Sequence, residues 1–310
     1  NQESVNSPNK VRVDLNNNNF YLNTSYKGGF GNNWQVTTGL SYGYSKNKLG
    51  LDLDKLNNDE NASHLKFKLR KSISQHVKLA FGTDYFITRF NEDFTPNSGF
   101  GGTSGYNSSI AAAFAEGDIL FTKNFAAKVG VRASYNDLLD ETAVAPRVSL
   151  AYKLNKTSQF SFAYGHFTQA PSVDFIKYSK MHQFESEKAS HYILNFQYNN
   201  DRQTFRAEAY YKDYSNLVKF NTTTPMFNSV YNNNGSGYAK GLDLFWRDGS
   251  SIKNLEYWIS YSYIDTERDY RNFPKQVTPS FVADHTASLV TKYFITDWKS
   301  QIGFTHSFAT

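Results

Sequence analysis

The seven histidines are the side chains of this chain best suited to hold a metal ion, and their spacing argues against that role. Histidine ligands recur at short, fixed spacings, such as the i, i+4 pair of a zinc-binding helix. No two histidines here stand at an i, i+2 or i, i+4 spacing. We therefore expect interface or loop histidines, and we predict no resident metal or cofactor. The histidines are His64, His76, His166, His182, His191, His285 and His306.

Three other stretches are weak candidates for chemistry. The acidic stretch 52–60 could bind calcium, but it lacks the glycine and terminal glutamate of an EF-hand loop, so we interpret it as a solvated loop. Gly101–Gly105 does not match the nucleophile elbow G-x-S-x-G. Glu208 could serve a hydrolase that pairs two carboxylates, but buried charges are normally satisfied as ion pairs. We predict that the protein is not an enzyme.

The elements that position these side chains are strands with two different faces. Segment 34–45 alternates an apolar set with a small or polar set. A strand places successive side chains on opposite faces, so this alternation predicts one apolar and one polar face. A transmembrane β-barrel needs that pattern, with lipid outside and polar filling inside. The apolar set is Trp34, Val36, Thr38, Leu40, Tyr42 and Tyr44.

The same period-two pattern predicts about fourteen strands. Tight turns alternate with long polar loops, as periplasmic turns and extracellular loops do in outer-membrane barrels. We predict an all-β fold, an antiparallel transmembrane β-barrel domain over residues 1–310. The expected strands are 19–27, 34–46, 62–72, 77–90, 106–122, 126–136, 144–154, 159–169, 188–199, 203–214, 236–247, 255–266, 284–294 and 297–308. The expected long loops are 47–61, 91–105, 137–143, 170–187, 215–235 and 267–283.

The composition fits this fold and narrows the partners. Aromatic residues make up 17% of the 310 residues, while the mean hydropathy is −0.59. That balance suits a barrel that is half lumen and half lipid face, although a soluble all-β protein would share it. No apolar run approaches the ~20 residues of a spanning helix. The net charge of +5 comes from interspersed charges, which do not form a nucleic-acid footprint, and the chain has no cysteine.

Two sets of side chains are candidates for binding. Aromatic residues on the long loops above a pore are either ligand contacts or loop-to-loop packing residues, because rings give contact area at low entropy cost. Charged residues on the polar strand faces are expected to face the lumen. The loop set is Phe94, Phe100, Tyr178, His182, Phe227 and Tyr231. The lumen set is Arg132, Arg147, Arg206, Glu208 and Asp243.

Several phrases, taken in order, resemble a known family. They are Ala145–Tyr152, Phe160–Phe167, Gln169–Ser172, His191–Tyr198 and Asn232–Leu244. This series is similar to the barrel of TonB-dependent outer-membrane receptors, particularly the Asn-rich Bacteroidetes type. The resemblance implies a plugged barrel of 22 strands, of which this chain would supply about strands six to nineteen. Seven tight turns and six long loops agree, since they place both chain ends on the extracellular side. We therefore expect the plug domain and the terminal strands to lie outside this chain.

The resemblance also implies a function and a location. We expect a receptor in the outer membrane of a Gram-negative bacterium that takes up a scarce extracellular ligand. Its partners would be outer-membrane lipid and lipopolysaccharide, TonB through the missing plug, and an unknown small-molecule, glycan or peptide ligand. A surface lipoprotein is a further candidate partner, and no nucleic acid is expected. Two alternatives remain open: a passive porin-like channel, and a scaffold or adhesin barrel within an outer-membrane assembly.

Overall fold

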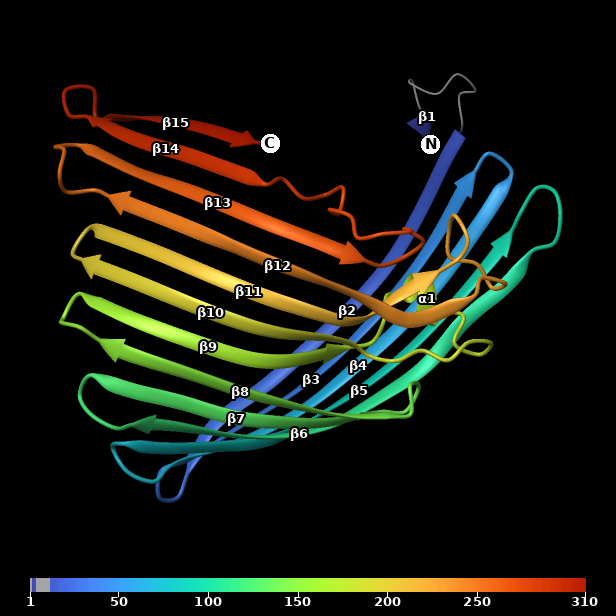
Figure 1. Ribbon diagram of the computed structural model, residues 1–310, viewed down its shortest axis with the longest axis horizontal. Coiled ribbons are helices and arrows are strands. Elements are labelled where there is room, and N and C mark those ends of the chain that lie inside the picture. Colours follow the sequence, from blue (N-terminus) through green and yellow to red (C-terminus); the bar gives the residue numbers. More distant parts are fainter. Residues whose placement is uncertain (1, 4–11) are drawn as a thin grey trace.

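The computed structural model describes residues 2–3 and 12–310, which form one antiparallel sheet in sequence order from β1 to β15 (Figure 1). The predicted all-β fold and its fourteen strands are confirmed, and they correspond to β2–β15. The strands are β1 (Gln2–Glu3), β2 (Arg12–Phe30), β3 (Trp34–Leu51), β4 (Asp54–Ser72), β5 (Val77–Thr95), β6 (Gly102–Leu120), β7 (Phe125–Asn136), β8 (Glu141–Lys153), β9 (Ser158–Gln169), β10 (Glu187–Asn200), β11 (Gln203–Phe220), β12 (Tyr231–Asp248), β13 (Leu255–Asp269), β14 (His285–Ile295) and β15 (Ser300–Ala309).

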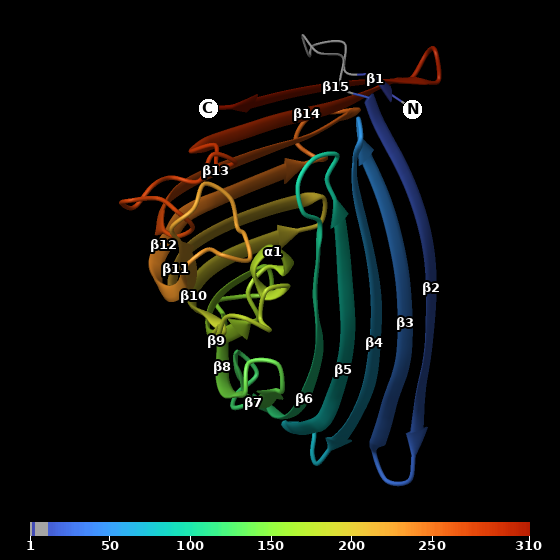
Figure 2. The same ribbon diagram turned by 90° about the vertical axis from the view of Figure 1, so that its right-hand side faces the viewer.

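The sheet curls so strongly that its two halves face each other. Figure 2 shows β2–β6 on one side of a hollow and β8–β13 on the other, with the short helix α1 (Val173–Ile176) between them. Neighbouring strands twist relative to one another in a fixed hand, and this twist curls a wide sheet toward closure. No helix in the described part of the chain has the length and apolar character needed to cross a membrane.

The predicted long loop at 47–61 is wrong. Strands β3 and β4 pair without interruption up to Leu51 and Asp54, so only Asp52 and Leu53 form the turn. The acidic stretch 52–60 therefore lies mostly on a hairpin. Polar side chains dominate this stretch, so apolar alternation does not mark the strand, yet the main chain still forms a full ladder.

Two further predicted loops are shorter than expected for the same reason. The loop expected at 91–105 shrinks to 96–101, and the loop expected at 215–235 shrinks to 221–230. Amide side chains add bonds between the extended strands, such as the 3.0 Å bond that Asn47 Nδ2 donates to Asn58 Oδ1. Strands β2–β6 contain 18 or 19 residues each, more than the ~9–11 that a membrane crossing needs.

The inner face of the sheet can be followed through the strand register, because directly paired residues share a face. Asp84 pairs with Ala112, and the same parity continues strand by strand to Glu208. Lys177, from the segment inside the curl, contacts Glu92 on this face. The polar face therefore points into the hollow, and the apolar face points outward.

The connection between β9 and β10, residues 170–186, folds into the hollow, and we call it the inner segment. It contains α1, which Ser172 caps at its first turn. The Ser172 side chain accepts a hydrogen bond from the Asp174 N–H. Its apolar side chains join a small core with β11 that also touches Leu139 and Tyr231. This apolar cluster consists of Phe175, Phe184, Val218 and Phe220.

Candidate functional site

A cavity of about 1120 Å³ lies where the inner segment meets the ends of β4–β6 and the loop 221–230, and we call it the mouth cavity. Phe94 lines it from β5 and Phe100 from the loop that follows β5. Tyr178 and Met181 line it from the inner segment, and Phe227 lines it from the loop 221–230. These side chains come from three separate stretches of sequence. The tertiary fold thus concentrates apolar and aromatic surface at one end of the hollow.

Four of the six predicted binding residues line this cavity: Phe94, Phe100, Tyr178 and Phe227. The other two support it from behind. His182 Nε2 lies 2.8 Å from the carbonyl oxygen of Phe227, and the Tyr231 hydroxyl donates to the Met226 carbonyl oxygen at 2.7 Å. Both readings of the aromatic set are therefore represented, as cavity lining and as packing between loops.

Two members of the aromatic set do not lie on loops as expected. Phe94 belongs to β5 and Tyr231 is the first residue of β12. Both were assigned to loops because the strands extend past the last apolar alternation.

The Tyr231 hydroxyl lies in a partly buried environment. Burial raises the pKa of this hydroxyl above its ordinary value, and the nearby Tyr178 adds to the shift. The hydrogen bonds of Tyr231 and the charge of Lys177 oppose the shift.

The sequence reasoning missed Met226, and with it a compositional signal. The chain contains two methionines, Met181 and Met226, and both line the mouth cavity. Methionine is flexible and polarizable, so it adapts to irregular apolar ligands. The rarity of methionine elsewhere could have drawn attention to these two positions.

An ion pair in the lining of the mouth cavity joins the inner segment to the wall. Lys177 Nζ of the inner segment lies 2.6 Å from Glu92 Oε1 of β5, and their side chains are 15% and 13% exposed. Burial lowers the pKa of Lys177, but the hydrogen bond and charge of Glu92 outweigh burial, so the pKa lies above its ordinary value. No local sequence pattern could predict this ion pair, because the two residues are 85 positions apart.

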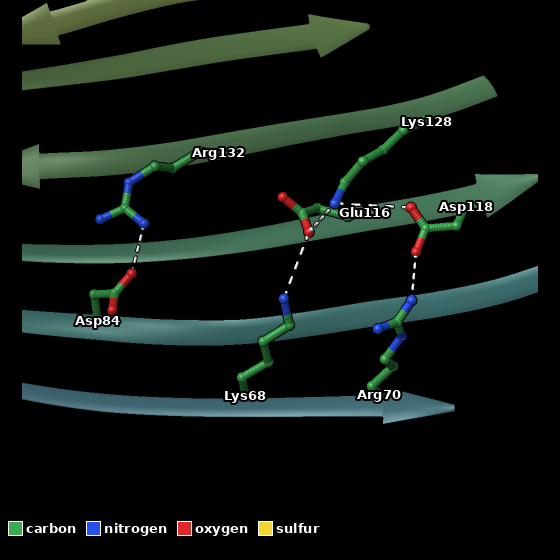
Figure 3. A network of polar contacts seen from close by, with 7 residues as sticks. All are labelled: Lys68, Arg70, Asp84, Glu116, Asp118, Lys128 and Arg132. Carbon is green, nitrogen blue, oxygen red and sulfur yellow. Dashed lines mark hydrogen bonds and ion pairs between the residues drawn. The ribbon is translucent and has the colours of Figure 1, made fainter. Parts of the chain in front are cut away.

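The predicted lumen residue Arg132 is part of a network of polar contacts on the inner face (Figure 3). Arg132 Nη1 lies 2.6 Å from Asp84 Oδ2, and on the other side His64 Nε2 lies 3.0 Å from Asp84 Oδ1. Farther along the wall, Lys68 and Lys128 both face Glu116, at 3.6 and 3.4 Å. The charges of this network are thus paired with partners on other strands of β4–β7.

The other lumen residues lie on the same inner face. The Arg147 guanidinium sits 4.7 Å from the centre of the Phe167 ring. Arg206, Glu208 and Asp243 line a second cavity of about 710 Å³ along β10–β15. Glu208 accepts a 3.3 Å bond from Asn195, so its contacts are those of a structural carboxylate. Among the described residues, no group of three histidines or carboxylates is placed to hold a metal ion.

Comparisons with known proteins agree with this architecture. Residues 1–309 match the family model "TonB dependent receptor-like, beta-barrel". No curated protein sequence matches the chain. Similar solved structures include the alcaligin outer-membrane receptor FauA of Bordetella pertussis, with a TM-score of 0.72 and 14% identity, covering 97% of this chain and 54% of that one.

Two further structures show the same fold. The FrpB iron transporter of Neisseria meningitidis has a TM-score of 0.74 at 11% identity, covering 94% of this chain and 50% of that one. The ferric-catecholate import receptor Fiu of Escherichia coli has a TM-score of 0.68 at 10% identity, covering 96% and 54%. The chain thus spans about half the length of these proteins. The Bacteroidetes type stays a prediction.

The family match and the inner and outer faces of the sheet lead to one assignment. The family is one of receptors and transporters rather than enzymes, and its barrels lie in the outer membrane of Gram-negative bacteria. The polar inner face, the apolar outer face and the order of β2–β15 are those of such a barrel wall. This chain belongs to the TonB-dependent receptor-like β-barrel family.

Proposed function

We propose that the chain forms barrel wall and extracellular mouth of a receptor that takes up a scarce ligand in a TonB-dependent manner. The mouth cavity carries this proposal, because it joins wall, inner segment and loop 221–230 into one concave surface where aromatic side chains lie among charged and amide side chains. Ligand sites are usually concave, with apolar and aromatic side chains that give contact area and polar groups that fix the orientation of the ligand. Phe94, Phe100, Tyr178 and Phe227 are the proposed contacts.

The remaining parts of such a receptor would come from outside this chain. We propose that further strands complete the barrel, because β1 and β15 do not pair with each other in the described residues and open sheet edges are not tolerated in lipid. A plug domain inside the barrel would contact TonB. The charged inner face of β4–β7 and the cavity along β10–β15 offer it a polar surface.

The test is uptake by cells that express or lack the parent protein. Ferric citrate and a ferric catecholate, labelled with radioactive iron, are suitable first probes. The similar structures include an iron transporter, a ferric citrate transporter and a ferric-catecholate import receptor. Accumulation that requires the parent protein and stops when tonB is deleted supports the proposal. A mutant with Phe94 and Phe227 both changed to Ala should then lose affinity while still reaching the membrane.

The alternatives give different results in the same cells. Solute entry that continues without tonB, together with steady conductance of the purified protein, indicates a passive channel. A stoichiometric partner, such as a surface lipoprotein, without accumulation of any probe indicates a scaffold or adhesin. Each outcome contradicts active uptake by a distinct measurement.

A further inference from the structure

We propose that the inner segment is a gate over the mouth cavity, hinged on the apolar cluster and latched at Lys177. The proposal rests on the proposed function only in taking the mouth cavity to be the ligand site. Figure 2 shows α1 lying between the two facing halves of the sheet, which is where a movable element would control access. The cavity has one side on this segment, at Tyr178 and Met181, and its other side on the wall, at Phe94.

The hinge side is held by buried apolar surface. Phe175 and Phe184 are 7% and 5% exposed, and they pack with Val218 and Phe220, which are 2% and 7% exposed. Returning such side chains to water is costly, because hydrophobic stabilisation scales with buried apolar area. This side therefore stays attached to β11 when other contacts break.

The latch side depends on one residue. Within the described part of the chain, two hydrogen bonds join the inner segment to β5 and β6, and both involve Lys177. Its ammonium group donates to Glu92 at 2.6 Å, and its carbonyl oxygen accepts the Gly105 N–H at 3.0 Å. A small displacement of the segment tip breaks both bonds together, which suits a two-state element.

The closed position also leaves one polar group unsatisfied. Ser179 Oγ, at the segment tip, is buried without a hydrogen-bond partner in the described residues. A buried hydroxyl without a partner destabilises the state that contains it. Opening at the latch would expose this hydroxyl to water, so it lowers the free-energy difference between the closed and open positions.

The test measures the position of the segment directly. The chain has no cysteine, so spin labels can be placed at Lys180→Cys and Asp93→Cys once any cysteine elsewhere in the full-length protein is replaced by serine. Electron paramagnetic resonance then gives the distance distribution in lipid nanodiscs. Lys177→Met should add a longer-distance population and raise the open-to-closed ratio by about tenfold or more, as expected for the loss of a charge-assisted bond. Glu92→Gln should move it in the same direction.

Lys188→Met is the matched control. It removes a different ion pair, Lys188 with Glu141 at 3.4 Å, at the start of β10. It should leave the distances unchanged, whereas an unchanged distribution in Lys177→Met, or equal opening in Lys188→Met, overturns the proposal. The measurement needs no ligand, so its result is independent of whether the protein takes up any probe.

Discussion

Asp84 shows at the scale of one residue how a barrel wall carries charge on its inner face. Its side chain is 7% exposed, and it contacts Arg132 at 2.6 Å and His64 at 3.0 Å. A buried carboxylate is tolerated only when it is paired and hydrogen-bonded, and here both conditions are met by residues of β4 and β7. The carboxylate therefore acts as the centre of a cross-strand clamp from β4 to β7.

Changing Asp84 to Asn should destabilise the barrel by about 1–3 kcal/mol, because Arg132 loses its charged partner in a partly buried position. Asp118→Asn is the matched control. Its pair with Arg70 at 2.7 Å is 36% and 41% exposed, so it should cost only about 0–1 kcal/mol. Urea unfolding in lipid vesicles compares the two free energies of unfolding. Equal losses would show that burial does not determine how much each ion pair contributes to the free energy of unfolding.

Lys177 allows a prediction from charge alone. Because its pKa is raised in the folded protein, the latch contributes fully at pH values below the ordinary lysine value of 10.5 and is lost as the pH rises through the raised value. The longer spin-label distance should therefore appear at strongly alkaline pH in the spin-labelled protein that retains Lys177 and Glu92. Lys177→Met should show no such transition, and a pH response that persists in this variant would contradict the assignment.

The β5–β6 hairpin shows at the scale of an element why a strand can need glycine. Gly105 has φ +149°, and a Cβ at this position would lie 2.2 Å from the Phe90 carbonyl oxygen. The absence of a side chain lets β6 approach β5 and lets the Gly105 N–H reach Lys177. The β5–β6 hairpin and the hydrogen bond to Lys177 therefore both require a glycine at position 105.

Gly105→Ala should distort the end of this hairpin and release the inner segment, because the added methyl group overlaps backbone atoms. Gly102→Ala is the matched control, since a Cβ there has no atom within 4 Å. Limited proteolysis of the inner segment should be faster in Gly105→Ala than in Gly102→Ala. Identical cleavage rates would mean that the hairpin tolerates the methyl group.

The whole molecule is organised by the difference between its two faces. Leu194 and Asn195 are consecutive residues in the middle of β10, and the register places them on opposite sides of the wall. Leu194 is 53% exposed on the outer face, whereas Asn195 pairs with Glu208 on the inner face and donates a bond to it. One residue step thus separates lipid from lumen.

Leu194→Lys should destabilise the barrel by about 2–4 kcal/mol, the range for a charge at the bilayer midplane. Asn195→Lys places the same charge beside Glu208 and should cost much less. Equilibrium folding into lipid vesicles measures both variants. A larger cost for Asn195→Lys would reverse the assignment of inner and outer faces.

Much of this architecture was predictable from the alternation of residue types. The pattern from Trp34 to Tyr44 predicted a strand because lipid on one side and a polar lumen on the other impose a period of two. The same rule failed at 47–61, where polar side chains dominate both strands of the hairpin and alternation does not mark them. Strand ends such as Phe94 and Tyr231 were therefore assigned to loops.

The sequence by itself determined the strands, their order, the lipid and lumen faces and the family, because each depends on local periodicity or on ordered motifs. Only the tertiary structure decided which loop aromatics meet at the mouth cavity and that Lys177 reaches Glu92 across the hollow. Those contacts join residues far apart in the chain, and they arise from the curl of the sheet and the inward fold of the inner segment. No local pattern records either of them.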